Sequence, residues 1–210
     1  RPPSSTLFPY TTLFRSVTFQ EGETLTSVLP VSRFEEKFVV MATKRGIIKK
    51  TELGAFSNPR NSGIIALSID DGDAMIGVAL TDGKDQIVLG ARDGLAIRFK
   101  ETDVRPMGRN ARGVKGIELL EGDEVVDMAV LKPGDSLLTV CENGYGKRTD
   151  VDEYRLQSRG GKGVINIKTT QRNGKVVALK SVTDEDELMM ITSQGMMLRT
   201  PIAPIRLIGR

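Results

Sequence analysis

Positively charged side chains recur at one fixed place after a glycine in this sequence of 210 residues. The glycines lie 48, 50 and 51 residues apart, at Gly46, Gly94, Gly144 and Gly195. A cation follows each glycine four residues later, at Lys50, Arg98, Arg148 and Arg199. Lysine and arginine bind nucleic-acid phosphates without reading bases. A cation kept in register through every copy predicts a row of charge that points to solvent and meets a polyanion. Solvated cations that protect strand edges are the alternative.

The most distinctive peptide is a basic, glycine-rich loop, Gln157-Ser158-Arg159-Gly160-Gly161-Lys162-Gly163. Glycines let backbone N–H groups approach a phosphate, while Arg159 and Lys162 neutralise its charge. The alternative is a connection between strands in which the glycines serve only turn geometry. Related loops at residues 108–116 and 58–63 stand at matching places and favour the phosphate interpretation.

The cations of these turns and loops are the candidate contacts to nucleic-acid phosphate. They are Lys49, Lys50, Arg60, Arg98, Arg109, Arg112, Lys115, Lys147, Arg148, Arg159, Lys162, Arg199 and Arg210.

Residues for catalysis are scarce. The chain has no histidine, which excludes Ser/His and Cys/His nucleophilic pairs and the usual zinc sites. Cys141, Tyr145 and Tyr154 are expected to be structural. The stretch Asp71-Gly72-Asp73 resembles a metal ligand pair, but Glu121-Gly122-Asp123 and Glu21-Gly22-Glu23 repeat it as an acidic turn. We expect no catalytic residue, no metal and no cofactor in this chain.

Composition is compatible with a folded domain that binds a polyanion. The chain is 39% hydrophobic, with a formal net charge of +3 and a pI near 9.0. Acidic residues gather at 70–73, 121–124 and 183–187, which implies one acidic and one basic side. A single cysteine fits a reducing cytoplasm, and no apolar stretch approaches the roughly 18 residues of a membrane span.

The repeat also predicts the fold. Each unit of about 50 residues reads strand, turn, strand, basic loop, strand, acidic turn, strand, which is typical of a four-stranded propeller blade. Ten residues after each turn glycine an apolar side chain is expected in the core, at Phe56, Val104, Tyr154 and Ile205. We therefore predict an all-β, propeller-like β-pinwheel that is incomplete at both ends.

The predicted boundaries follow from the same copies. Residues 1–16 are expected to be an unrelated or disordered leader, and residues 17–37 the end of a preceding blade with a strand from Leu25 to Val31. Blades are predicted at 38–84, 85–134 and 135–186, and the start of a truncated blade at 187–210.

From Val17 to Arg210 the chain resembles the C-terminal domain of DNA gyrase A, part of a type IIA topoisomerase. The stretches that carry the resemblance are residues 38–43 with 49–51, Val104-Arg105-Pro106-Met107-Gly108, residues 143–149 and residues 163–168. Residues 157–163 are similar to the gyrase A box, Gln-Arg-Arg-Gly-Gly-Lys-Gly, with Ser158 in place of the first arginine. The family's box belongs to its first blade, so a box-like loop of a later blade is expected here.

The resemblance implies a six-bladed β-pinwheel whose basic outer rim wraps duplex DNA without sequence specificity. It implies a bacterial, cytoplasmic, nucleoid-associated A2B2 complex with the N-terminal part of gyrase A and with gyrase B. That complex introduces negative supercoils in an ATP-dependent reaction, and ATP and Mg are used elsewhere in the holoenzyme.

Three alternatives stay open: the related C-terminal domain of topoisomerase IV, a propeller that binds proteins, and an enzyme in its own right.

The row of cations predicted to be exposed leads to an expectation that a charge-reversal variant can test. Charge reversal of Arg98, Arg148 and Arg199 together should abolish DNA binding while the fold stays intact.

Overall fold

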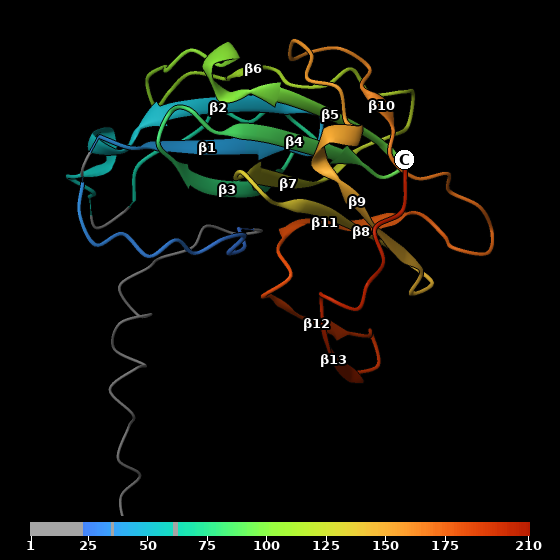
Figure 1. The fold of residues 1–210 in the computed structure, drawn as a ribbon. Helices are drawn as coiled ribbons and strands as arrows, with labels where there is room; N and C mark the ends of the chain where they lie inside the picture. The colour runs from blue at the N-terminus through green and yellow to red at the C-terminus, as the bar shows by residue number, and fades with distance from the viewer. Residues whose placement is uncertain (1–22, 35, 61–62) are drawn as a thin grey trace, which may run out of the picture.

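The computed structural model describes residues 23–34, 36–60 and 63–210, and this part of the chain is all-β (Figure 1). The predicted leader, residues 1–16, lies outside the described residues, as do residues 17–22. No helix in the described residues is long and apolar enough to cross a membrane. The all-β prediction is confirmed.

The strands follow the predicted repeat. Their bounds are β1 (Phe38–Thr43), β2 (Ile47–Glu52), β3 (Met75–Thr81), β4 (Gln86–Ala91), β5 (Leu95–Lys100), β6 (Val114–Lys115), β7 (Val125–Leu131), β8 (Ser136–Cys141), β9 (Gly146–Asp150), β10 (Val164–Ile165), β11 (Val176–Val182), β12 (Glu187–Ile191) and β13 (Met197–Pro201). Short 3-10 helices follow the second strand of three units, at η1 (Leu53–Phe56), η2 (Glu101–Asp103) and η3 (Val151–Glu153).

Each predicted hairpin turn is present. Antiparallel pairs form between β1 and β2, β4 and β5, β8 and β9, and β12 and β13. The turn glycines Gly46, Gly94, Gly144 and Gly195 have φ angles of 80°, 97°, 79° and 83°. Glycine reaches this left-handed region without the steric penalty of a Cβ, so the turns require it.

The first two sheets are built across units, which the repeat pattern did not predict. The first sheet has the order β3-β1-β2-β6 and the second β10-β5-β4-β7, so β6 and β10 complete the sheet of the preceding unit. Their register pairs Ile48 with Val114 and Ala96 with Val164. The third sheet has the order β11-β8-β9, and β12 and β13 form a separate pair. The first two blades therefore borrow their outer strand from the following unit.

We call residues 104–116, 154–166 and 205–210 the crossing segments, because each passes from its own unit onto the preceding blade. The N–H of Met107 donates to the carbonyl of Lys50 (2.9 Å), that of Gln157 to Arg98 (3.1 Å), and that of Ile208 to Arg148 (2.8 Å). The same hydrogen bond therefore joins every consecutive pair of units.

Apolar side chains pack between neighbouring blades. Val40, Ala42 and Ile48 of the first blade contact a cluster of the second that includes Leu89 and Phe99. A second cluster joins blades two and three, where Tyr154 and Leu179 are buried. Since both faces of β1 and β4 are covered, their sequences are continuous aliphatic runs. Burial of one such side chain stabilises the fold by about 1.5 to 3 kcal/mol.

The strand predicted from Leu25 to Val31 is wrong. This segment has no strand, and the side chains of Leu25 and Val28 are 62% and 73% exposed. A strand needs a partner for its backbone N–H and C=O groups, and no strand of the described residues pairs with this segment.

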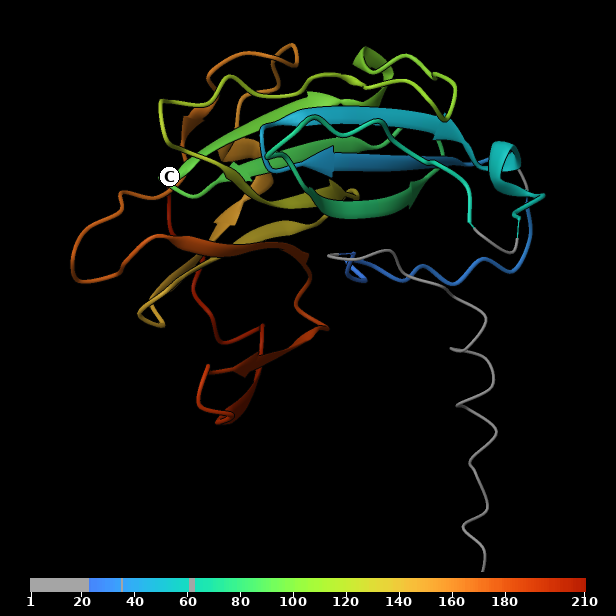
Figure 2. The same ribbon diagram turned by 180° about the vertical axis from the view of Figure 1, so that it is seen from behind.

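The inner strands β3, β7 and β11 lie side by side, with the hairpin turns of all three blades at one end (Figure 2). A chain of ion pairs links those turns. Lys44 contacts Glu124 (2.7 Å), Glu124 contacts Arg92 (3.2 Å), and Arg92 contacts Glu142 (2.9 Å). These partners lower the pKa of Glu124, with the Lys44 hydrogen bond as the largest cause. Charges at this end are thus largely matched.

Gly163 is required where its crossing segment passes over β5. Its φ is +77°, and a Cβ would lie 2.3 Å from the carbonyl oxygen of Ala96. Gly144 has a similar φ of +79° but no atom within 4 Å of its Cβ position. We predict that Gly163→Ala lowers the free energy of unfolding by about 2 to 4 kcal/mol, because strain and clash add. Gly144→Ala should lose only about 1 kcal/mol.

Urea denaturation of both variants measures the difference. Equal losses would show that the backbone at Ala96 does not constrain residue 163.

Candidate nucleic-acid interface

Two of the four cations that follow the hairpin turns are buried, and a third is mostly covered. Lys50 and Arg148 are 4% and 6% exposed, and the side chain of Arg98 is 11% exposed. The prediction that these side chains point to solvent is therefore wrong. Arg199 is exposed, but its guanidinium binds Glu187 (2.6 Å).

These covered cations fasten neighbouring blades together. The guanidinium of Arg98 donates to the carbonyls of Val151 (2.7 Å) and Tyr154 (3.0 Å), both beside η3 of the next unit. Its Nε donates to Gln86 (2.7 Å) within its own hairpin. A guanidinium offers five donors in a fixed fork, which suits three acceptors at once. The cation recurs because every unit has the same junction to hold.

Arg148 and Lys50 fill the same place with different partners. Nε of Arg148 donates to Ser136 (2.6 Å), and its guanidinium pairs with Asp184 (2.6 Å). Lys50 lies 5.0 Å from the ring centre of Phe38 and 3.6 Å from the carboxylate of Glu101. Because their charges are matched inside the protein, neither cation is available to a phosphate.

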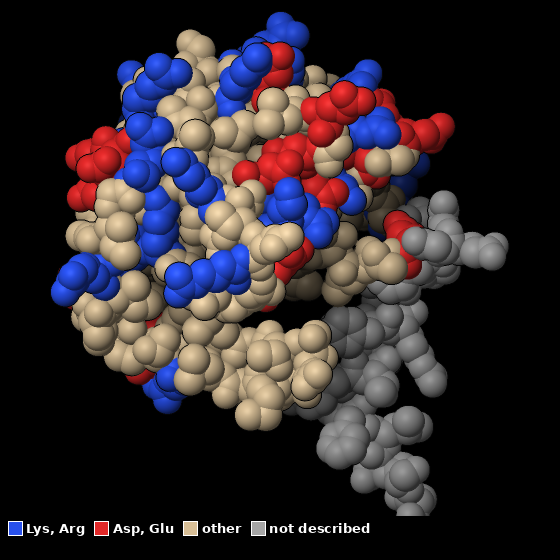
Figure 3. Space-filling model, turned by 90° about the vertical axis from the view of Figure 1, so that its right-hand side faces the viewer, with Lys and Arg blue, Asp and Glu red and all other residues tan. Residues whose placement is uncertain are grey.

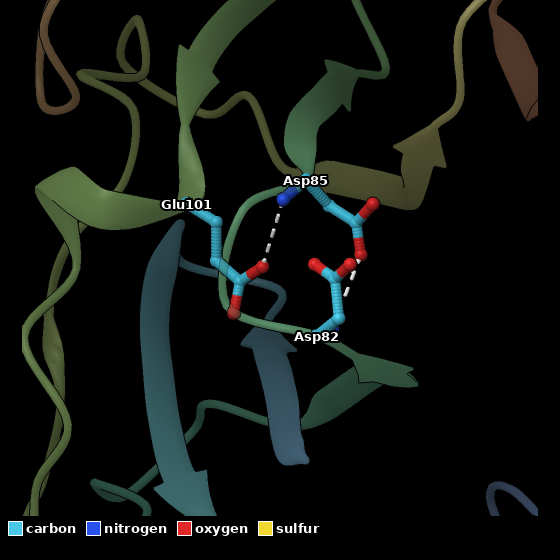
Figure 4. A group of neighbouring side chains, drawn as sticks. All are labelled: Asp82, Asp85 and Glu101. Carbon is cyan, nitrogen blue, oxygen red and sulfur yellow. Dashed lines mark hydrogen bonds between the residues drawn. The ribbon is translucent and has the colours of Figure 1, made fainter. Parts of the chain in front are cut away.

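Three carboxylates near Lys50 form the one cluster in the described residues that has metal-ligand spacing, Asp82, Asp85 and Glu101 (Figure 4). Its buried member already has partners: Glu101 accepts from the Thr81 hydroxyl (2.7 Å) and from the N–H of Asp85 (3.2 Å). Asp85 accepts from the N–H of Asp82 (3.4 Å) and closes the turn between β3 and β4. The cluster thus serves the turn and the Lys50 pair.

The acidic turns have an equally local task. Asp73 accepts from the N–H groups of Arg45 (2.9 Å) and Ala74 (2.8 Å). Asp123 accepts from those of Asp93 (3.0 Å) and Glu124 (2.8 Å), and partial burial raises its pKa. The turn interpretation of these aspartates accounts for both.

Lys49 and Lys147 each donate a hydrogen bond to a crossing segment. Nζ of Lys49 donates to the carbonyls of Ala66 (2.7 Å) and Arg109, and that of Lys147 to the carbonyl of Gly209 (3.1 Å). Burial lowers the pKa of both amines, since their charged forms are desolvated. Neither amine is a free surface charge.

The box-like loop packs on the crossing segment before it. The N–H of Gly160 donates to Gly116 (2.6 Å), and Gly161 accepts from the N–H of Glu118 (2.9 Å). Gly163 permits close passage over β5. Gly160 and Gly163 are therefore explained by the alternative to phosphate binding, in which the glycines permit the turn and the close crossing of the strand. The Nε2 of Gln157 is buried and has no hydrogen-bond partner in the described residues.

Arg159 and Arg210 combine a structural contact with free charge. Arg159 donates to the carbonyls of Asp103 (2.9 Å) and Lys115 (3.0 Å), and Arg210 reaches the carbonyl of Ile165 (3.4 Å). A carbonyl is a neutral acceptor, so each guanidinium keeps its full positive charge. Their remaining N–H groups can donate to a phosphate.

The other predicted cations divide by their partners. Arg112 is exposed but pairs with Asp70, and Lys115 lies 4.0 Å from Glu118. Arg60 and Lys162 are exposed, and Arg109 is half-buried. In the part of the chain that the structure describes, these last three side chains make no ion pair.

A second periodic cation was missed. Arg105, Arg155 and Arg206 are 50 and 51 residues apart and exposed. Among the described residues, none of the three guanidinium groups has an ion-pair or hydrogen-bond partner. Each arginine directly follows the recurrent apolar position, Val104, Tyr154 or Ile205. The sequence repeat therefore already indicated that an arginine recurs at this place.

Lys and Arg side chains are frequent toward one side and the top of the face seen in Figure 3, and Asp and Glu side chains gather near its middle. The crossing segments carry several exposed cations, among them Arg105, Arg155 and Arg206. Exposed lysine and arginine side chains of this kind can hold phosphates by charge.

Tyr154 is buried, and its hydroxyl donates to Oδ1 of Asn166 (2.6 Å). Burial raises the pKa of Tyr154 to about 12, and burial also raises the pKa of the Cys141 thiol. Both shifts favour the protonated form, and Tyr154 occupies the core position expected from the sequence.

Comparisons with known proteins agree on one family. The model of a family described as "DNA gyrase C-terminal domain, beta-propeller" matches residues 37–82, 85–132, 135–183 and 186–210. The chain is similar to DNA gyrase A of Salmonella typhimurium, with 48% identity over 192 residues, 91% of this chain and 22% of that protein. It is 44% identical to DNA gyrase A of Staphylococcus aureus over 199 residues, 93% of this chain and again 22% of the relative. The chain therefore spans about a fifth of the length of these relatives.

Solved structures show the same fold. The C-terminal domain of DNA topoisomerase IV superposes with a TM-score of 0.87 at 24% identity, covering 94% of this chain and 62% of that one. The DNA gyrase A C-terminal domain superposes with a TM-score of 0.78 at 27% identity, covering 85% and 60%. The predicted resemblance is confirmed at the level of family and fold.

The mostly covered position of Arg98 and its contacts to the next unit overturn the expectation that its charge can be reversed without loss of the fold. We predict that Arg98→Ala lowers the free energy of unfolding by about 2 to 4 kcal/mol, because it leaves buried acceptors unpaired. Arg105→Ala, a matched exposed arginine, should change stability by no more than about 0.5 kcal/mol. Denaturant titration tests both, and similar values for the two variants would contradict the assignment.

Tyr154 gives a pH-dependent prediction. Its folded-state pKa of about 12 lies above its ordinary value of 10.0, so the native state keeps a proton that the unfolded chain loses first. This contribution to stability is complete below pH 10 and is lost as pH rises through 12. Absorbance titration should show a tyrosine ionising near that upper value, and Tyr154→Phe should remove the step. Persistence of the step in that variant would assign it elsewhere.

Proposed function

The chain belongs to the DNA gyrase C-terminal domain family of beta-propellers, and on that premise we propose that it binds and wraps duplex DNA without sequence specificity. The contact surface is the basic rim formed by the crossing segments together with Arg60, which lies in the loop after η1. One observation carries this proposal: Arg105, Arg155 and Arg206 are unpaired, exposed and repeated on rigid backbone.

The interface consists of the rim cations whose charge is not matched inside the protein. They are Arg60, Arg105, Arg109, Arg155, Arg159, Lys162, Arg206 and Arg210. The buried Lys49, Lys50 and Arg148 and the mostly covered Arg98 are left out. Lys147 supports the rim through its hydrogen bond to Gly209. Arg112, Lys115 and Arg199, which have acidic partners, contribute less.

Wrapping requires that many weak contacts act together. Bending a short duplex by 40 to 90° costs about 1 to 6 kcal/mol, which repeated phosphate contacts must offset. Each neutralised phosphate releases counterions and adds about −0.9 to the slope of log affinity against log salt. Because the rim cations meet the duplex through its negative charge, affinity depends on length and salt more than on sequence.

The proposal extends to the larger assembly in which the relatives act. In that setting this domain presents a wrapped DNA segment to the N-terminal part of gyrase A, within a cytoplasmic A2B2 complex with gyrase B. Strand cleavage, ATP hydrolysis and the Mg they need are assigned to those other parts, and negative supercoiling to the whole. The box-like loop, residues 157–163, contributes Arg159 and Lys162 to the rim.

Two alternatives make different predictions. A topoisomerase IV domain shares this fold, but the similarity at 24% identity concerns the fold alone, whereas the curated relatives at 44–48% identity are gyrase proteins. A protein-binding propeller would present an apolar or acidic face. The unpaired arginines favour DNA.

We predict that replacing Arg105, Arg155 and Arg206 together with glutamine reduces the magnitude of the salt slope by about 2.7, or 0.9 for each lost contact. The fold should be unchanged, since no described residue depends on these side chains. Equilibrium binding to mixed-sequence duplexes across a salt titration measures the slope.

A matched control removes the same net charge elsewhere. Lys84, Lys132 and Arg172 are exposed and lie outside the crossing segments. Their triple glutamine variant should keep the slope of the original chain. If both triple variants lose the same amount, net charge and not the rim governs binding.

A further inference from the structure

Each crossing segment carries an exposed apolar residue directly after its unpaired arginine. These residues are Pro106, Leu156 and Leu207, which are 50 and 51 residues apart. Leu156 and Leu207 are 43% and 50% exposed, and Pro106 is exposed as well. The arginine and its apolar neighbour thus form a repeated pair on the rim.

The backbone that carries these side chains is fixed. Pro106, Leu156 and Leu207 each form a parallel β-bridge, with Lys50, Arg98 and Arg148 respectively. The next residue in every case donates its N–H to the same partner strand. The apolar side chains are therefore presented from the edge of a sheet and not from a loose loop.

A single exposed leucine needs no explanation, because much of any protein surface is apolar. These three differ in two respects. They occupy the same place in successive units, and each stands beside a guanidinium that no described residue neutralises. An apolar protein surface would have to desolvate those arginines, so the flanking charge disfavours a protein partner.

The minor groove of DNA matches both halves of the pair. Its negative potential attracts arginine, most strongly where the groove is narrow. Proteins that bend DNA from this groove insert Phe, Leu, Ile, Met or Pro side chains between base pairs, which unstacks one step and kinks the duplex. Leucine and proline both belong to that set.

We propose that Pro106, Leu156 and Leu207 are minor-groove wedges that kink the DNA lying on the rim, with Arg105, Arg155 and Arg206 holding the groove against them. The inference rests on the proposed DNA binding and adds how the bend is made. Bending is concentrated at the wedges, and flexible pyrimidine–purine steps such as TA are favoured at those points.

The test compares the whole chain with a triple variant, P106A/L156A/L207A, on duplexes of about 40 base pairs, roughly four helical turns. The duplex carries fluorophores at its ends and 2-aminopurine at a central TA step. The variant should bind with a dissociation constant within about threefold and with an unchanged salt slope, because its cations remain. Energy transfer between the ends and the 2-aminopurine enhancement should both fall toward the values of free DNA.

Two further variants control for surface apolarity. L120A/V177A/M189A removes side chains of similar exposure, 51%, 49% and 56%, outside the crossing segments, and should bend DNA like the original chain. L156M/L207M keeps flexible apolar side chains at two wedge positions and should retain the bend.

The outcomes separate the two proposals. A P106A/L156A/L207A variant that bends and unstacks DNA like the original chain overturns the wedges. Bending by the original chain without any 2-aminopurine enhancement also overturns them, while the rim assignment stands. An original chain that binds no duplex at low salt overturns the proposed function, and the wedges with it.

Discussion

The structure depends on one backbone hydrogen bond, which each unit donates to the second strand of the unit before it. The carbonyls of Lys50, Arg98 and Arg148 accept this bond at 2.8 to 3.1 Å. An unpaired strand edge exposes a row of N–H and C=O groups that invites pairing with other chains. The crossing segment of the following unit covers that edge. Its path over the strand then determines which positions need a glycine and which need a cation.

Hairpins and cores could be predicted from the sequence because both depend on local patterns. The turn glycines, the run from Val125 to Leu131 and the core position of Tyr154 are recognisable by residue type and spacing. Strands β6 and β10 are not, since two residues such as Val114 and Lys115 are too few for a pattern. Their pairing is set by a distant partner, because Val114 pairs with Ile48, which lies 66 residues earlier in the sequence. The stretch from Leu25 to Val31 shows the converse, an apolar pattern that pairs with no strand of the described residues.

Periodic charge proved harder to interpret than periodic apolarity. Arg98 and Arg105 both recur with the repeat, yet one lies inside a blade junction and the other on its outer surface. A residue type that recurs in every unit indicates that its environment is the same in each. It does not indicate whether that environment is exposed to solvent or buried. Only the carbonyls of Val151 and Tyr154, which arrive from the next unit, reveal that Arg98 is a structural cation. The mostly covered position of Arg98 and the exposed position of Arg105 could therefore be distinguished only from the three-dimensional arrangement of neighbouring units.

The equivalence of the junctions has an evolutionary consequence. Since every unit gives its outer segment backward with the same hydrogen bond, the surface between any two consecutive units is interchangeable in its backbone geometry. Duplication or loss of one unit by recombination leaves each remaining donor facing a suitable acceptor. Blade number can thus drift among descendants while every individual junction stays under the same selection.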